Sequence, residues 1–158
     1  MASEQIHIKE IEMLIENEEG VANLYKAYGK KFPKYQSFWL DMAKDETEHA
    51  DNIRNLYSKI KNGSAYFKEG RFKKEAIGIF SNYLQRSILE LKTQEVSLKN
   101  ALSISLDLEN ATIESSYSDV FEGDSAELKH TLATLLADEK KHHSKIKDAL
   151  AQVISLSP

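Results

Sequence analysis

Four long segments of the chain carry apolar residues at steps of three and four, and ionisable side chains interrupt these stripes only near their middles. Residues at such steps share one face of an α-helix, so each stripe predicts the buried face of an amphipathic helix. A lone buried charge would be strongly destabilising, and these side chains must therefore contact one another or a cation. The interrupting residues are Glu18, Glu46, His49, Glu109, Glu139 and His142.

The composition favours an all-α protein. The chain has 158 residues, of which 41% are hydrophobic, with only six glycines and two prolines. This length is sufficient for one domain, expected to span residues 1–158, with a sizeable core. The absence of cysteine excludes disulfides, zinc–thiolate sites, iron–sulfur clusters and thiol catalysis.

Charge and hydropathy indicate neither a nucleic-acid nor a membrane partner. The net charge is −4 and no long basic run is present, whereas nucleic acids and anionic lipids attract clustered lysine and arginine. The N-terminus lacks a basic segment followed by an apolar stretch, and no apolar run reaches the roughly 18 residues of a membrane span. We therefore expect a cytoplasmic protein.

Turn-forming residues divide the four stripes into two hairpins. Pro33 lies near the midpoint between Glu18 and Glu46, and the Gly- and Ser-containing segment 122–125 lies near the midpoint of the second pair of stripes. Residues equidistant from the turn of an antiparallel hairpin lie level with each other. The glutamates of each hairpin are therefore predicted to face one another.

The segment between the hairpins predicts the topology. Gly63 and Gly70 bracket a loop, and the apolar stripe from Ile77 to Leu91 predicts a crossover helix before Thr93 caps the next long helix. The crossover is long enough to run the length of the bundle, which gives a ferritin-like four-helix bundle with one long crossover. The apolar face of the crossover helix packs either on the bundle of its own chain or on a second copy of the protein. We expect a homodimer. We expect long helices over residues 4–31, 34–61, 94–121 and 125–154, with the crossover helix over residues 72–91.

Charge and register favour a di-metal site. Four carboxylates and two neutral imidazoles balance two divalent metals in a low-dielectric core. Choosing Glu19 instead of Glu18 would bring polar residues onto the first stripe, and Glu114 would do the same to the third stripe in place of Glu109. The motif Asp-Glu-x-x-His at residues 45–49 returns later in the chain, which indicates an internal duplication.

Two further Glu-x-x-His steps are weaker candidates. Glu127 and His130 bracket Leu128 instead of joining its stripe, and Glu127 in a first turn favours the helix dipole. Glu4 and His7 continue the first stripe, but at the start of its helix, where helices fray. We expect neither pair to belong to the central site.

Residues next to the site have two interpretations. Tyr25 lies two turns from Glu18 on the same stripe. It either acts on the site, by a hydrogen bond from its hydroxyl to a ligand carboxylate or by donating an electron, or is an ordinary core tyrosine. Asp45 and Asp138 directly precede glutamates of the site, and we expect them to face solvent. His143 is off its stripe and expected to be exposed.

The segments 42–51, 101–116 and 137–142, together with Glu18 and Tyr25, resemble the helix signatures of the rubrerythrin and ferritin-like di-iron carboxylate family. The resemblance implies a pair of irons bridged by two of the glutamates, with manganese suited to the same ligands. The resemblance further implies that Glu46 and Glu139 bridge the two irons. It implies that Glu18 and His49 bind one iron and that Glu109 and His142 bind the other.

The chain departs from the peroxide-reducing rubrerythrins at two helix positions and in its lack of cysteine. Those proteins carry an extra carboxylate where this chain has Thr112, and the tyrosine expected at Ser116 stands instead at Tyr117. They usually also carry a rubredoxin-like four-cysteine domain, which this chain cannot form. The departures weigh against the complete peroxidase cycle of those proteins, and they leave the metal site intact.

Four functions are compatible with such a site. The leading hypothesis is a di-iron oxidoreductase that reacts with H2O2 or O2 and takes electrons from an external donor such as a rubredoxin-like protein. The second is a ferroxidase or iron-handling protein. The third is a hydroxylase of an organic substrate, which needs an apolar pocket, and the fourth is a structural bundle with a vestigial site.

Overall fold

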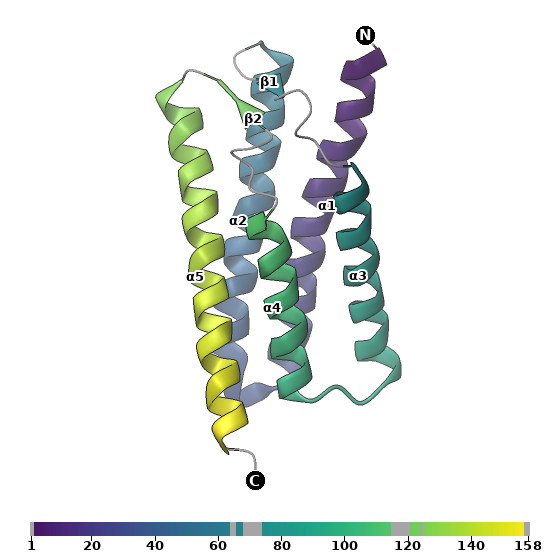
Figure 1. The fold of residues 1–158 in the computed structure, drawn as a ribbon, viewed down its shortest axis with the longest axis vertical. Coiled ribbons are helices and arrows are strands. Elements are labelled where there is room, and N and C mark those ends of the chain that lie inside the picture. The colour runs from purple at the N-terminus through teal and green to yellow at the C-terminus, as the bar shows by residue number, and fades with distance from the viewer. Residues whose placement is uncertain (1, 64–65, 68–73, 115–120, 124, 157–158) are drawn as a thin grey trace.

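The structure, a computed structural model, describes residues 2–63, 66–67, 74–114, 121–123 and 125–156. This part of the chain is mostly helical (Figure 1), which confirms the all-α prediction. A 3-10 turn, η1 (Pro33–Tyr35), follows the first helix, and two short strands, β1 (Tyr66–Phe67) and β2 (Phe121–Glu122), pair antiparallel. The helices are α1 (Ala2–Lys31), α2 (Gln36–Lys61), α3 (Lys74–Thr93), α4 (Leu98–Glu114) and α5 (Ala126–Leu156).

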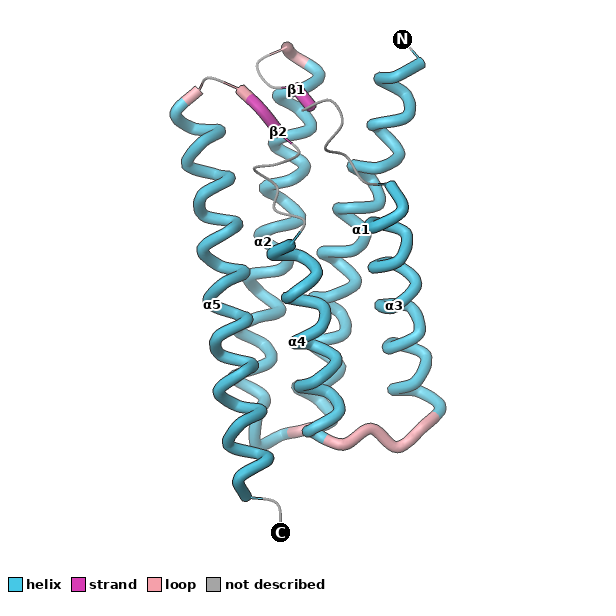
Figure 2. The backbone as a smooth tube through the Cα atoms, viewed as in Figure 1, coloured by secondary structure: helices cyan, strands magenta, loops and turns pink. Residues whose placement is uncertain are grey.

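The helices run in the order expected for a ferritin-like bundle. In Figure 1, α1 descends from the N-terminus, α2 rises, α3 descends beside α1, α4 rises and α5 descends to the C-terminus. Figure 2 shows the extended loop that joins α3 to α4 at the lower end. Helices α2 and α4 are therefore parallel, and the one-crossover ferritin-like fold is confirmed.

Short polar side chains and a proline determine where the helices begin. Pro33 opens η1, since its fixed φ suits the first position of a helical turn. Ser125 accepts a hydrogen bond from the backbone N–H of Leu128 at 3.0 Å, which caps α5. These two residues stabilise the turn of each hairpin.

The helix expected over residues 94–121 is shorter than predicted. Thr93, expected to cap this helix, instead ends α3 and donates its hydroxyl to the carbonyl of Leu89 at 2.9 Å. Ser97 is the cap, accepting a hydrogen bond from the N–H of Asn100 at 3.1 Å. Because the chain must first cross from α3 to α4, α4 (Leu98–Glu114) begins later than predicted. Residues 115–120 of the predicted helix lie outside the described residues, and Phe121 belongs to β2.

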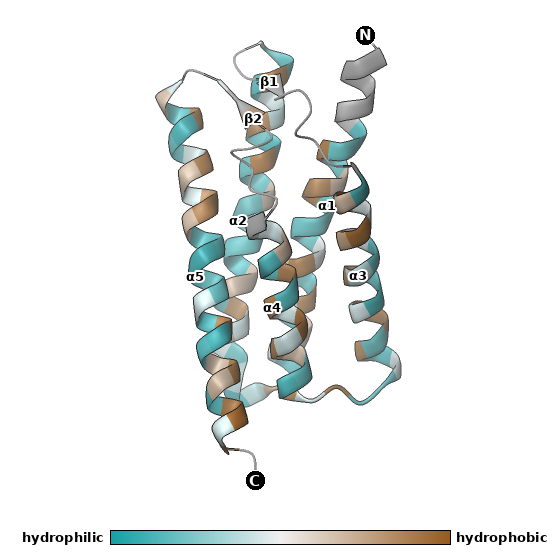
Figure 3. Ribbon diagram, in the orientation of Figure 1, coloured by the Kyte–Doolittle hydropathy of each residue, from teal (hydrophilic) through white to brown (hydrophobic). Residues whose placement is uncertain are grey.

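The core has two parts, and the predicted site lies between them along α1, α2 and α5. Near η1, Trp39 is surrounded by aromatic rings, with ring centroids 5.5 Å from Tyr25, 4.9 Å from Tyr28 and 5.1 Å from Phe38. Figure 3 shows apolar and polar residues alternating along each helix. The second part of the hydrophobic core contains Ile11, Ile53, Leu56, Phe121, Leu128, Leu132 and Leu135.

The crossover helix α3 covers the bundle of its own chain. Leu84 of α3 is buried and packs so closely on α1 that a Cβ added at Gly20 would lie 2.6 Å from its Cδ2. Ile79 and Leu89, on the same helix, remain 70% and 59% exposed. None of the helices in the described part of the chain is long and apolar enough to cross a membrane.

Candidate metal centre

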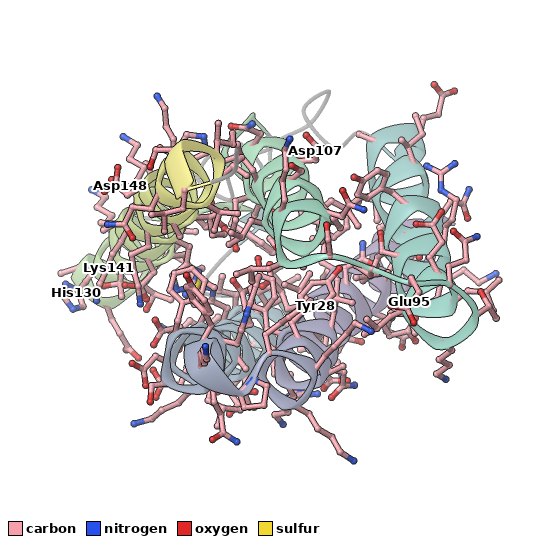
Figure 4. All side chains as sticks on the ribbon, turned by 90° about the horizontal axis from the view of Figure 1, so that it is seen from below. Tyr28, Glu95, Asp107, His130, Lys141 and Asp148 are labelled. Atoms are coloured by element: carbon pink, nitrogen blue, oxygen red, sulfur yellow. The ribbon has the colours of Figure 1, made fainter. Side chains whose placement is uncertain are left out.

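The six predicted site residues all lie in the interior of the bundle. They come from four helices: one each from α1 and α4, and a Glu and a His from each of α2 and α5. Figure 4 shows these helices around a common interior, with α3 on the outside. None of the six is more than 5% exposed; they are Glu18, Glu46, His49, Glu109, Glu139 and His142.

Five of the six side chains form two groups that share one glutamate. Within each group, one potential ligand atom from every residue lies within 4.8 Å of the others. The first group contains Glu18, Glu46 and His49, and the second contains Glu46, Glu109 and His142. Glu46 therefore belongs to both groups.

The two histidines present the same ring nitrogen to the groups. His49 Nδ1 lies 3.3 Å from Glu46 Oε2 and 3.8 Å from Glu18 Oε2. His142 Nδ1 lies 3.0 Å from Glu46 Oε1 and 3.5 Å from Glu109 Oε1. The rings are stacked, with centroids 5.9 Å apart. This arrangement has the twofold character that the repeated motif predicted.

Glu139 is buried beside the groups without belonging to either. It is 1% exposed, and neither of its carboxylate oxygens has a hydrogen-bond partner among the described residues. Burial, followed by the charges of Glu18, Glu46 and Glu109, raises its pKa to about 10. A buried acid without partners is costly, and a bound cation would satisfy both oxygens. The donor set thus fits a pair of metals.

Protonation would satisfy the site in the absence of metal. Burial raises the pKa of Glu46 well above its usual value, and the charges of Glu18 and Glu109 raise it further. Burial alone would lower the pKa of His49, but Glu18 and Glu46 outweigh burial and raise it to about 12. Metal binding at neutral pH must therefore displace protons from this cluster.

The predicted solvent-facing positions of Asp45 and Asp138 are wrong. Asp45 Oδ2 lies 2.9 Å from Nε2 of His142, and Asp138 Oδ2 lies 3.0 Å from Nε2 of His49. Each aspartate thus contacts the histidine of the opposite helix, because α2 and α5 pack with their motifs level. Accepting the Nε2 proton leaves Nδ1 free to bind a metal. The sequence signal was the aspartate repeated before each motif glutamate.

Tyr25 makes the hydrogen bond that one of its two interpretations predicted. Its hydroxyl donates to Glu109 Oε1 at 2.7 Å, across from α1 to α4. Burial and the charge of Glu109 raise the pKa of this phenol well above its usual value. The phenol therefore remains protonated at neutral pH and orients the carboxylate of Glu109.

The weaker Glu-x-x-His candidate on α5 lies away from the site. Glu127 is exposed and pairs with Lys59 at 3.1 Å, and Figure 4 shows His130 at the outer edge of α5. His143 is half-buried, not exposed as expected. The side chains of residues 4, 7, 116 and 117 lie outside the described part of the structure.

Two buried polar residues on α1 were not foreseen. Glu10 is 3% exposed and lies two turns before Glu18, and Asn17 is 7% exposed. A signal for Glu10 existed, since its steps of four through Leu14 to Glu18 continue the first stripe. Asn17 is adjacent to that stripe, and periodicity alone gave no signal for its burial.

Comparison with known proteins defines the family of this helical bundle. The Rubrerythrin family model matches residues 9–150, and the chain therefore belongs to the Rubrerythrin family. Members of this family bind a pair of irons, react with peroxide or oxygen and are generally oxidoreductases. The comparisons with curated proteins and with solved structures give no match.

Proposed function

We propose that this protein is a di-iron oxidoreductase that reacts with H2O2 or O2. The observation that carries the proposal is the sharing of Glu46 between two groups of buried carboxylate and imidazole ligands. A di-metal site needs such a shared carboxylate, whereas a structural ion pair needs only one acid for each histidine. The family match supports iron as the metal, and manganese suits the same ligands.

In the proposed site, each residue has a defined role. Glu18 and His49 would hold one ion, Glu109 and His142 would hold the other, and Glu46 and Glu139 would be ligands shared by both. Bound iron would supply the redox chemistry that reduces the oxidant. The protein balances the charge of the two ions and fixes both imidazoles through the aspartates on the opposite helices.

The electron donor is proposed to be external. The chain has no cysteine and so cannot carry the iron–sulfur relay of a rubredoxin-like domain. A rubredoxin-like partner protein is one suitable donor. We further propose that residues 1–158 form one di-iron domain, which acts as a homodimer in the cytoplasm without nucleic-acid or membrane partners.

Anaerobic loading with Fe(II) tests the proposal. We expect two irons per chain, and stopped-flow absorbance should show formation of ferric product faster than with free Fe(II) when H2O2 or O2 is added. Glu46→Ala should lose the second iron, whereas Glu48→Ala, at an exposed position on the same helix, should bind two. A wild-type stoichiometry well below two, or oxidation no faster than in buffer, would contradict it.

One observation favours a ferroxidase as the second candidate. Position 112, where peroxide-reducing rubrerythrins have a carboxylate, is occupied by Thr112, whose hydroxyl donates to the carbonyl of Leu108 at 2.9 Å. Without that extra ligand, the electrons for the oxidant would come from added Fe(II) itself. A ferroxidase would consume added Fe(II) over many turnovers and release ferric iron. An oxidoreductase would instead turn over a reductant while retaining both irons.

A further inference from the structure

A cavity of about 330 Å³ lies between α1, α3 and α4. Its lining includes Glu18 of the metal centre, and the neighbouring Asn17 and Leu108 are also buried. Two other lining residues, Ile79 and Asp107, are exposed to solvent. Asp107 is labelled on α4 in Figure 4. The cavity therefore connects the surface with one side of the metal centre.

Most of the cavity lining is apolar. The side chains of Leu14, Ile77, Ile79 and Phe80 contribute to it, together with two alanines. Apolar walls with a few polar groups are typical of sites for small organic molecules. The volume is about twice that of an apolar cavity of roughly 150 Å³ that holds benzene, so a bicyclic ring system matches its size.

The polar groups of the lining select the charge of a ligand. Asn17 is 7% exposed and is an uncharged polar residue of the cavity lining. The charged residues of the lining are Glu18 and Asp107, and no lysine, arginine or histidine stands among the described residues that line the cavity. Two carboxylates disfavour an anion, while the nearly buried amide of Asn17 favours a molecule that can hydrogen-bond to it.

We propose that this cavity binds a small uncharged aromatic molecule that carries one O–H or N–H donor. The donor binds the side-chain oxygen of Asn17, and the ring packs against Ile77 and Phe80. This binding goes beyond the proposed di-iron function and does not require metal. In the metal-loaded protein, the bound molecule would lie beside Glu18.

Thr112 is a key residue of this proposal because it also lines the cavity. Its hydroxyl is already bonded to the backbone of its own helix, so it contributes no charge and no free donor. A glutamate at this position would add a third carboxylate and occupy part of the space. Thr112→Glu should therefore weaken the binding of a neutral aromatic ligand at least tenfold.

Binding to the metal-free protein tests the proposal directly. Calorimetric titration with 1-naphthol should show saturable binding of one molecule per chain, and indole should behave similarly. The anion 1-naphthoate, of nearly the same shape, should bind at least tenfold more weakly. Asn17→Leu should weaken 1-naphthol about fivefold, the loss of one hydrogen bond, and should leave naphthalene unchanged.

A matched pair of cavity and surface variants locates the site. Ala111→Phe fills the cavity and should abolish binding, whereas Ala133→Phe on the exposed side of α5 should not change it. Amide chemical-shift changes in the wild-type protein should centre on Asn17, Phe80 and Ala111. The proposal is overturned if 1-naphthol does not saturate, if 1-naphthoate binds equally well, or if the shifts lie elsewhere. None of these outcomes depends on iron, so they leave the di-iron proposal to its own test.

Discussion

Replacing either Asp45 or Asp138 is expected to lower the metal affinity of one of the two proposed metal positions and to leave that of the other unchanged. Asp45 contacts His142 Nε2 at 2.9 Å, and Asp138 contacts His49 Nε2 at 3.0 Å. Each histidine belongs to a different group of potential ligands. Asp45→Ala should therefore lower the metal affinity of the group with Glu109, and Asp138→Ala should lower that of the group with Glu18.

The size of the effect follows from the orientation of the imidazole. Loss of such an outer hydrogen bond typically lowers metal affinity about 10- to 100-fold, which corresponds to about 1.4–2.8 kcal/mol. The side chains of Asp45 and Asp138 are 31% and 33% exposed, so water can replace part of the lost interaction. We therefore expect about a tenfold loss, near the lower limit of this range.

Co(II) titration against a competing chelator measures both binding steps. Each single variant should weaken one step and leave the other within about twofold, and the double variant should weaken both. Asp41→Ala on α2 and Asp148→Ala on α5, at exposed positions, are the controls. If Asp45→Ala weakens both steps equally, or neither step, then the crosswise pairing does not orient the histidines.

Three further predictions concern the metal-free protein. The pKa of Glu139 is raised from 4.5 to about 10 and that of His49 from 6.5 to about 12, so the folded state retains protons that the unfolded chain loses, and the free energy of unfolding should fall between pH 7 and pH 9. Urea denaturation would show this fall, shallower in Glu139→Gln, and a rise would contradict it. Tyr25→Phe removes a buried hydrogen bond and should cost about 1–3 kcal/mol by the same measurement, whereas no loss would show that the bond contributes nothing. Gly20→Ala should displace the side chain of buried Leu84 and lower the thermal midpoint, although alanine favours a helix by about 1 kcal/mol over glycine; a raised midpoint would show that the displacement costs less than this gain.

Periodicity in the sequence predicted much of the fold. The positions of apolar residues specify which face of each helix is buried, and this depends on the helical repeat and not on the partner helix. The same reasoning placed Glu18, Glu46, Glu109 and Glu139 on buried faces, where the structure has them. It was less accurate at helix ends, because Thr93 and Ser97 are both good caps and only the path of the crossover selects between them.

The distances between helices were decided by the tertiary structure alone. The sequence showed that Asp45 and Asp138 repeat, but only the packing of α2 against α5 brings each aspartate to the opposite histidine. Likewise, the cavity beside Asn17 exists because α3 lies across α1 and α4. A stripe specifies the direction in which a side chain faces, and it contains no information about how closely or at what angle two helices meet. The sequence by itself thus determined the helices, their buried faces and the candidate ligands, whereas packing decided the hydrogen bonds around them and the space that remains beside them.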